Sequence, residues 1–390
     1  GRIQMKFTFH VSPSIKNNLS TQRIMKELTL GLLVVFAAAV IYYGKSIGAD
    51  AALHCILLLA CSLITTLVCE SIFAKIMKKD VKTFLKNSFG WVSAIILTLM
   101  VPVNMSCYAV IVATVFAIVI AKLLFGGFGQ NIFNPAAVGR ALILQAFTGV
   151  SVRLVTYATP TTTIASTYHW LPANARVLDA FLKTINGTNK GTFLDLALGN
   201  YPGSLGETFT ILILIIGVVL AIRQIIDWRV PVVYLGTIFV LTAVVAAITG
   251  INSYHGIPAI IWYPLLHILT GGVVFGAVFM LTDPVTSPTS ASGRVVFAMG
   301  AAIITVLIRL KANLPEGCLY SILLMNMFTP WIESCFDGKQ LELVKKSRIV
   351  CACLALIGLA ISFYAASSIQ KVEDVPANTA AVVETMEVTL

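Results

Sequence analysis

The chain has 390 residues, of which 58% are hydrophobic and 11% are charged, whereas soluble domains carry about 25% charged residues. This composition and a mean hydropathy of +0.90 exclude a soluble globular domain, because one aqueous core cannot bury so much apolar surface, and indicate repeated membrane spans. The net charge of +10 does not indicate nucleic-acid binding, because the basic residues cluster at the ends of apolar segments, as they do in membrane proteins.

The apolar runs predict an all-α polytopic membrane protein with about ten transmembrane helices and one further helix near the C-terminus. The first five helices are expected near residues 24–44, 51–74, 88–103, 108–125 and 136–150. A long polar stretch, 151–207, separates them from the next five, which are expected near 208–226, 230–250, 258–282, 294–310 and 316–333. The final apolar run, 349–366, predicts an eleventh helix.

The distribution of basic residues predicts the orientation. With the N-terminus inside, nineteen of the 27 Lys and Arg residues fall on the inner side and eight on the outer side, which favours a cytoplasmic N-terminus in a bacterial inner membrane. The inner count includes Lys122 and Arg140 as helix-end charges, and the outer count includes Arg309. The stretch 151–207 is then periplasmic, and so is the C-terminal tail if 349–366 spans.

Some residues that could carry chemistry have a plainer interpretation. The eight cysteines form no C-x-x-C pair, so neither a disulfide framework nor an iron–sulfur site is predicted. We expect Glu70, near the inner end of its helix, to snorkel. His267 lies in an apolar run, and packing or hydrogen bonding is the expected role rather than a proton relay. Asp227-Trp228-Arg229 is expected to be an interfacial turn.

Two parts of the chain resemble each other. Residues 96–106 and 279–287 each run from an apolar helix into a Pro-Val pair followed by small polar residues. Five helices in each half would insert the second half upside down, the inverted repeat common in transporters, with broken helices near a binding site. The alternative is a chance likeness between apolar helices. The expected domains are a tail (1–23), a first repeat (24–150), an outer loop (151–207), a second repeat (208–333) and a C-terminal extension (334–390).

The segment 126–140 reads Gly-Gly-Phe-Gly-Gln-Asn-Ile-Phe-Asn-Pro-Ala-Ala-Val-Gly-Arg. Its glycines allow close approach of the backbone to a ligand. Asn131 and Asn134 are three residues apart and can lie on one face of a helical turn, where two amides offer donors and acceptors to a neutral polar ring. A tight interhelical turn capped by asparagines explains the same pattern, and the residues alone favour neither interpretation.

The segment 282–294 places Asp283 at the end of an apolar run, followed by hydroxyl side chains that include Thr286. A carboxylate at that depth needs a partner or a function, and the hydroxyls could bind an ion or the edge of a flavin. The alternative is a capped, solvated helix end in which Arg294 screens Asp283.

The outer stretch offers two weaker candidates. Thr156 to Thr163 is rich in hydroxyl groups, and nothing in its chemistry alone marks one threonine as a covalent anchor. Asp195 to Glu207 is a glycine-containing loop that enters the sixth helix. Glu207 suits the positive end of that helix, so a packed cap is at least as good an explanation as catalysis.

These segments together resemble the D subunits of the Rnf ion-pumping complex and the related B subunit of the sodium-pumping NADH:quinone oxidoreductase. The resemblance covers roughly residues 5–335. The matching motifs are the run 126–140, Gly203-Ser-Leu-Gly-Glu207, Ile226-Asp-Trp-Arg229, Thr282-Asp-Pro-Val-Thr-Ser-Pro288 and Leu323-Leu-Met-Asn-Met-Phe-Thr-Pro330. The run 349–366 and the tail after it depart from the shorter family members.

The resemblance implies two flavins. The family attaches FMN by a phosphoester to the Thr of a Ser-Gly-Ala-Thr-Pro-like motif, and the matching stretch here, Thr156-Tyr157-Ala158-Thr159-Pro160, implies Thr159 as the anchor, with Thr161 as the alternative. Thr replaces Ser and Tyr replaces Gly in that motif. A non-covalent riboflavin is implied within the helices towards the cytoplasm, lined by Asn131, Asn134 and Asp283, with Thr286 a further flavin or ion candidate.

The implied activity is electron transfer between the two flavins, coupled to Na⁺ or H⁺ translocation, in a ferredoxin:NAD oxidoreductase complex that includes subunits of the A, B, C, E and G types. A passive channel, or a transporter of flavin or another solute, would share the inverted repeat. Neither rival would carry a covalent flavin.

Overall fold

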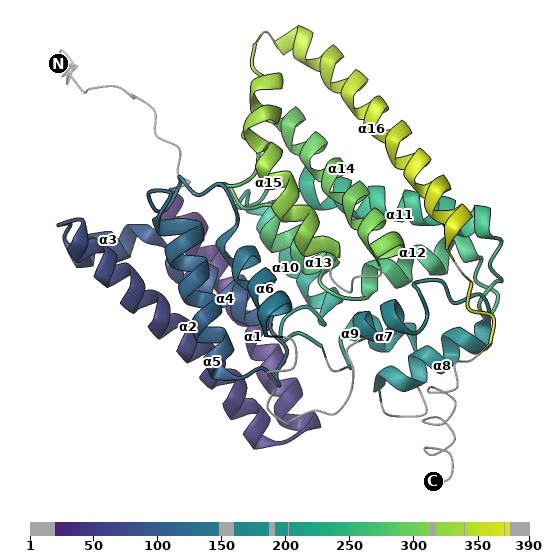
Figure 1. The fold of residues 1–390 in the computed structure, drawn as a ribbon, viewed down its shortest axis with the longest axis horizontal. Helices are drawn as coiled ribbons and strands as arrows, with labels where there is room; N and C mark the ends of the chain where they lie inside the picture. The colour runs from purple at the N-terminus through teal and green to yellow at the C-terminus, as the bar shows by residue number, and fades with distance from the viewer. Residues whose placement is uncertain are drawn as a thin grey trace, which may run out of the picture.

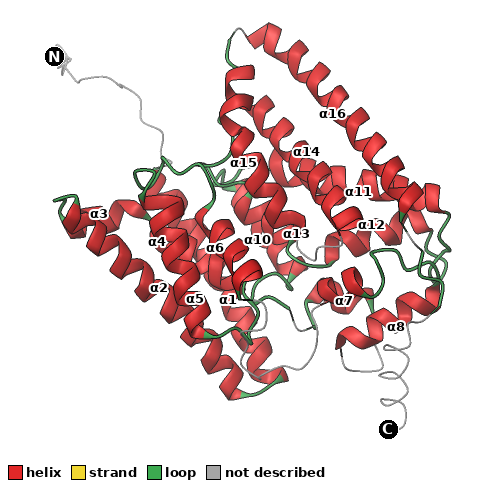
Figure 2. Ribbon diagram, viewed as in Figure 1, coloured by secondary structure: helices red, strands yellow, loops and turns green. Residues whose placement is uncertain are grey.

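The computed structural model describes residues 20–147, 160–186, 192–201, 203–312, 317–338, 340–369 and 371–374, which form helices and no strand (Figure 2). Five helical segments are long and apolar enough to span a membrane by themselves. These are α1 (Thr21–Ser46), α2 (Ala49–Ile76), α11 (Arg229–Thr249), α14 (Ala291–Leu307) with the π-helical η3 (Ile308–Ala312), and α16 (Gln340–Ser368).

A sixth candidate span is a bent pair, α12 (Ala259–Leu269) followed by α13 (Val273–Phe275) and the π-helical η2 (Gly276–Met280), which meet at 72°. The shorter apolar helices are α4 (Gly90–Leu99), α5 (Cys107–Val115) with the π-helical η1 (Phe116–Leu123), and α10 (Thr210–Ile222). Two more helices complete the two halves, α6 (Pro135–Ala146) and α15 (Gly317–Cys335). The predicted all-α polytopic membrane fold is confirmed.

The helices of the two halves form two adjoining groups, with α1 to α6 on one side of the molecule and α10 to α16 on the other (Figure 1). At one face, called here the N-terminal face, α1 begins, and Glu27 on α1 pairs with Arg223 at 2.6 Å. At the opposite face, called the loop face, Tyr43 near the end of α1 donates to the carbonyl of Gly203 at 2.8 Å. The first half therefore contacts the second half at the N-terminal face and the stretch that precedes α10 at the loop face.

Several predicted boundaries were wrong. The span expected at 258–282 is broken at Thr270-Gly271-Gly272, because Gly271 adopts a left-handed conformation (φ 73°) that an α-helix does not contain. The helix expected at 88–103 is shorter, since Phe89 (φ 51°) separates the surface helix α3 (Val81–Ser88) from α4. The helix expected at 136–150 begins at Pro135 and ends at Ala146.

The polar stretch 151–207, expected as a loop, contains three short helices, α7 (Pro160–Ser166), α8 (Ala175–Asn186) and α9 (Phe193–Leu198). They lie at the loop face. In the segment between α9 and α10, the backbone N–H of Leu205 donates to the carbonyl of Val101, which follows α4, at 3.0 Å. The backbone N–H of Gly206 donates to the carbonyl of Leu99, the last residue of α4, at 2.7 Å.

A buried cation marks the end of the fourth helix in each half. Lys122 on η1 donates to the carbonyl of Ser88 at the α3–α4 break (2.6 Å). Arg309 on η3 donates to the carbonyls of His267 and Thr270 at the α12–α13 break (2.9 Å for Thr270). Each cation thus satisfies carbonyls that a broken third helix leaves without their own partners. The Lys122 contact lies at the N-terminal face and the Arg309 contact towards the loop face, as an inverted repeat requires.

Three buried cations, these two and Arg140, change the count of basic residues on the two sides. The count placed Lys122 and Arg140 at inner helix ends and Arg309 on the outer side, but all three side chains are buried. They therefore carry no weight in the orientation argument. The remaining asymmetry still favours the same orientation.

The C-terminal helix α16 packs along α11 and α14 (Figure 1), and Lys311 lies 4.5 Å above the ring of Tyr364 on α16. The chain then pairs with the loop-face segment: Val372 donates to the carbonyl of Leu171 (3.2 Å) and accepts from Ala173 (3.0 Å). Since 371–374 lies at the loop face, α16 returns the chain to the side that carries α7 and α8.

Candidate functional site

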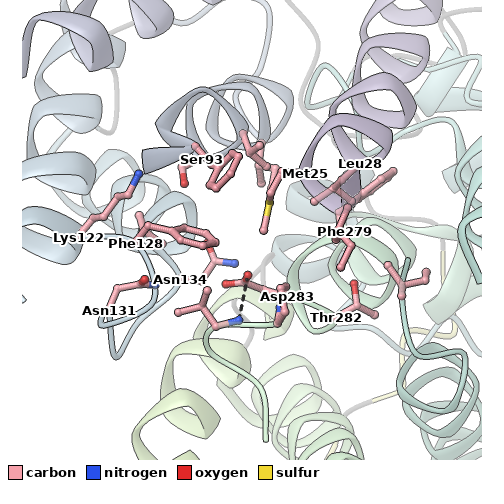
Figure 3. Close-up of a pocket in the computed structure, with 18 of the residues that line it drawn as sticks. Met25, Leu28, Ser93, Lys122, Phe128, Asn131, Asn134, Phe279, Thr282 and Asp283 are labelled. Carbon is pink, nitrogen blue, oxygen red and sulfur yellow. Dashed lines mark hydrogen bonds between the residues drawn. The ribbon is translucent and has the colours of Figure 1, made fainter. Parts of the chain in front are cut away.

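A small cavity of about 50 Å³ lies at the N-terminal face between the two halves (Figure 3). Its walls come from the start of α1, from α4 and η1, from the loop before α6, and from the loop that follows η2. Of the predicted site residues, Asn131, Asn134 and Asp283 line it together. The structure therefore brings together two motifs that lie about 150 residues apart in the sequence.

The asparagines combine both roles that the sequence left open. Asn134 is the N-cap of α6, and its Oδ1 accepts from the backbone N–H groups of Ala136 (3.1 Å) and Ala137 (3.4 Å). Asn131 donates through Nδ2 to the carbonyl of Phe133 at 3.0 Å. These bonds hold the amides rigid, and they leave the Nδ2 group of Asn134 and the Oδ1 of Asn131 without a partner in the described part of the chain. One donor and one acceptor can therefore serve a ligand.

Aromatic rings form the apolar walls of the cavity. Phe128 packs edge-on against Phe89 with ring centroids 4.9 Å apart, and Phe279 faces the cavity from η2 (Figure 3). Three phenyl rings with a few convergent polar groups are the lining that small-molecule sites use. The combination suits a flat ring with a polar edge.

Asp283 presents its carboxylate to the cavity (Figure 3). The carboxylate accepts from Thr286 Oγ1 at 3.1 Å and from the backbone N–H of Val285 at 3.4 Å. Burial raises the pKa of this carboxyl above its usual value, against the opposing effect of these two hydrogen bonds and of Lys122. A carboxyl with a raised pKa that faces a cavity is suited to gain and lose a proton or bind a cation.

The alternative interpretation, in which Arg294 screens Asp283, is wrong about Arg294. Arg294 instead donates to Asp227 at 2.8 Å and to the carbonyl of Pro288 at 2.9 Å. It thereby ties the loop that carries Asp283 to the turn before α11. The capped helix end was correct, since Ser290 caps α14 by accepting from Gly293.

A buried ion pair borders the cavity on the first-half side. Lys122 Nζ lies 2.9 Å from Glu70 Oε1, with side chains 2% and 1% exposed. Glu70 also accepts from Ser88 Oγ at 2.5 Å, so the carboxylate does not snorkel as expected. Lys122 was not among the predicted site residues. Its partner lies 52 positions away in the sequence, and its position inside an apolar run was the only available signal.

The other predicted residues lie elsewhere. Thr286 is buried and contacts Asp283 without lining the cavity. Glu207 lies towards the loop face, where it lines a second cavity of about 10 Å³ together with Gly272 and Arg309. Thr159 lies outside the described residues, and Thr161 lies in α7, where the structure does not describe its side chain.

Comparison with known proteins gives consistent matches over most of the chain. Residues 8–342 match the model of the NQR2, RnfD, RnfE family. The D subunit of the proton-translocating ferredoxin:NAD(+) oxidoreductase complex of Clostridium ljungdahlii is 33% identical over 84% of this chain and 93% of its own length. The D subunit of the Na(+)-translocating ferredoxin:NAD(+) oxidoreductase complex of Acetobacterium woodii is 34% identical over 85% of this chain and 93% of its own. The D subunit of the ion-translocating oxidoreductase complex of Halorhodospira halophila is 32% identical over 82% and 91%.

Proposed function

Because this chain belongs to the NQR2, RnfD, RnfE family, we propose that it is the D-type membrane subunit of an ion-translocating ferredoxin:NAD⁺ oxidoreductase complex. In this role it carries a non-covalent riboflavin in the cavity at the N-terminal face and an FMN on Thr159, the residue that precedes α7 in the sequence. Electrons pass between the two, and other Rnf subunits, of the A, B, C, E and G types, supply and receive them.

The observation that carries the proposal is the cavity lined by Asn131, Asn134 and Asp283 between aromatic walls. The Asn134 amide and the Asn131 carbonyl match the alternating acceptors and donors on the edge of a flavin ring, and Phe128 and Phe279 match its faces. The donor set therefore fits a flavin. A bound flavin supplies the one- and two-electron chemistry, and the protein holds it, excludes water and sets the surrounding charge.

Asp283 is the proposed coupling group for ion movement. It lies between the two halves of the inverted repeat, and its carboxylate can carry a proton or contact a cation. Moving one charge against about 100 mV requires about 2.3 kcal/mol, which is within reach of flavin redox steps. The named relatives differ in the ion, H⁺ in one and Na⁺ in the other, and the proposal covers either ion.

The proposed location is the bacterial inner membrane with the N-terminal face in the cytoplasm. This orientation places the riboflavin cavity on the cytoplasmic side and α7 to α9 on the periplasmic side. The basic segment that ends α2 and leads to α3, with Lys75, Lys78 and Lys79, agrees with it.

Flavin fluorescence on a denaturing gel tests the covalent part. We expect a fluorescent band from the full-length protein produced in cells that contain the flavin transferase, and a dark band from Thr159→Val. A dark wild-type band would reject the covalent FMN and favour the channel or transporter alternatives. A bright Thr159→Val band that darkens in Thr161→Val would move the anchor to Thr161.

A further inference from the structure

We infer that a groove between α3 and the loop that follows η1 binds the headgroup of an anionic phospholipid. This inference goes beyond the proposed function, because it depends on neither flavin. The groove measures about 480 Å³ and lies at the N-terminal face, where α3 extends from the end of α2 at the outer edge of the first half (Figure 1). Its volume is within the range of about 300–1,000 Å³ that small-molecule sites have.

The groove is separate from the cavity that carries the proposed riboflavin. Among the described residues the two linings share Phe128 alone, so the ring of Phe128 forms part of the wall between them. A lipid headgroup can therefore bind in the groove while the cavity holds another molecule.

The groove combines polar groups with aromatic rings. Thr83 and Asn87 lie four residues apart on one face of α3, and both line the groove, as does Lys79 just before that helix. The rings of Phe84 and Phe128 belong to the same lining. The ammonium, hydroxyl and amide groups can donate to the oxygens of a phosphate and its glycerol, and the rings can contact the carbons between them.

The segment from the end of α2 to α3 is strongly basic, which favours a negatively charged headgroup. Residues 75–86 contain one acidic residue, Asp80, and five lysines: Lys75, Lys78, Lys79, Lys82 and Lys86. Within the described residues, none of the five lysines forms an ion pair with a carboxylate. Basic clusters beside the end of a membrane span are the pattern that attracts anionic lipids.

Asp80 also lines the groove, but its carboxylate is engaged by α3. It caps that helix and accepts from the backbone N–H of Thr83 at 2.9 Å and from Thr83 Oγ1 at 2.7 Å. Its negative charge is thus directed to the positive end of the helix. The Nζ of Lys79 instead lies 5.7 Å from the centre of the Phe84 ring, where a phosphate can reach it.

The surface beside the groove is apolar, which favours a lipid over a soluble anion or an acidic protein segment. Ile76 ends α2 and Met77 follows it, and they are 70% and 50% exposed. Leu124 and Phe125, which lead into the other wall at Gly126, are 70% and 40% exposed. Because α2 packs against η1, acyl chains attached to a phosphate in the groove can cover these side chains.

Both walls of the groove are held in place before a ligand binds. The ring of Phe84 on α3 lies 6.0 Å from that of Phe73 on α2, and the ring of Phe128 lies 4.9 Å from that of Phe89. A preformed site loses less conformational freedom when its ligand binds, so more of the contact energy appears as affinity.

The test measures thermal unfolding of the full-length protein in detergent after bound lipid has been washed away. Three probes are titrated: phosphatidylglycerol, the neutral phosphatidylcholine with the same acyl chains, and glycerol 3-phosphate, which has no acyl chains. A molecule that binds only the folded state raises the unfolding temperature. We expect phosphatidylglycerol to raise it by several degrees and the other two probes to leave it unchanged at the same concentrations.

Two variants assign the effect to the groove. Lys79→Gln removes the cation and Asn87→Leu removes the amide, and both side chains are exposed, so neither change should alter unfolding without lipid. Each should raise the half-saturating concentration of phosphatidylglycerol at least threefold. Lys82→Gln is the matched control, because it removes the same charge from α3 but does not line the groove; it should bind phosphatidylglycerol as the wild-type protein does.

Four results would overturn the inference. Equal shifts from phosphatidylglycerol and phosphatidylcholine would reject an anionic headgroup, and an equal shift from glycerol 3-phosphate would assign the groove to a free phosphate. Equal losses in Lys79→Gln and Lys82→Gln would mean a diffuse attraction without a site. Protection of Asn87→Cys from maleimide in membranes that contain the whole complex, but not in membranes with this chain alone, would assign the groove to a partner protein.

Discussion

The pair formed by Lys122 and Glu70 is the least replaceable polar contact beside the cavity. Both side chains are almost fully buried, so removing one partner leaves the other charge without compensation. We predict that Lys122→Met or Glu70→Gln lowers stability by about 3–5 kcal/mol, and that the double variant recovers part of that loss. Thermal unfolding in detergent of the wild-type protein, the two single variants and the double variant forms a double-mutant cycle, which measures the coupling energy between Lys122 and Glu70. Additive effects of the two substitutions would contradict a direct interaction.

Asp227 gives a prediction that depends on pH. Burial raises its pKa, but the hydrogen bonds from Arg294 and from the backbone of Arg229 outweigh burial, so the pKa is lowered overall. The stabilisation is therefore complete above the ordinary pKa of an aspartate and is lost as the pH falls through the lowered value. At pH 7, Asp227→Asn should lower the free energy of unfolding by about 1 kcal/mol. The variant should therefore unfold at a lower temperature than the wild-type protein. The difference should shrink as the pH falls below the ordinary pKa of an aspartate, and a constant difference would contradict the ionic origin.

The sequence identified site residues that belong to a recognisable local motif. It missed contacts whose two partners lie far apart in the sequence. Asn131 and Asn134 stand beside glycines, and Asp283 interrupts an apolar run, so each was a visible candidate. Glu70 was expected to reach the surface because its partner Lys122 is 52 residues away. The alternative interpretation of segment 282–294 paired Arg294 with Asp283, but the partner of Arg294 is Asp227, 67 residues away.

At the scale of elements, the breaks within helices are the features that hydrophobic composition did not predict. Apolar side chains continue through Thr270-Gly271-Gly272, so the run was predicted as one helix. The break became possible because Arg309, far along the chain, satisfies the carbonyls of His267 and Thr270. The single long helices α1, α2, α11 and α14 were predicted within a few residues, because a span across lipid needs a long apolar segment whatever its neighbours.

The C-terminal segment after α16 provides an element-scale prediction. Val372 pairs with Leu171 and Ala173, and Asn174 donates to the carbonyl of Glu373 at 3.2 Å. Deleting 371–390 should leave the helices intact but expose the segment 160–186 to protease applied at the loop face, at least severalfold faster than in wild type. Deleting only 375–390 keeps the pairing and is the control. Equal cleavage of the two truncations would show that the pairing does not hold this segment.

At the scale of the whole molecule, the family predicted from the motifs is confirmed by the match over residues 8–342. The motifs 126–140 and 282–288, which contributed to that prediction, both supply residues that line the cavity. The extension that forms α16 reaches beyond that match, and its position against α11 and α14 could not be predicted, since any lipid-facing helix has a similar composition.

The opposite placement of the two faces yields a topology prediction. With a cytoplasmic N-terminal face, Glu373→Cys should react with a membrane-impermeant maleimide in intact spheroplasts, against the wild-type protein as background. Lys82→Cys, on α3 at the N-terminal face, should react only after lysis. The reverse pattern would invert the orientation, and labelling of both from outside would contradict α16 as a span.

The central claim is that the cavity between the halves holds a flavin without a covalent bond. The most direct measurement is the amount of riboflavin released when the purified full-length protein is denatured and filtered. We expect about one riboflavin per chain from the wild-type protein, and a large loss of riboflavin from Asn134→Asp or Asn131→Leu with the gel-fluorescent FMN retained. Release of no riboflavin from a protein that still carries covalent FMN would show that this cavity does not hold a non-covalent flavin.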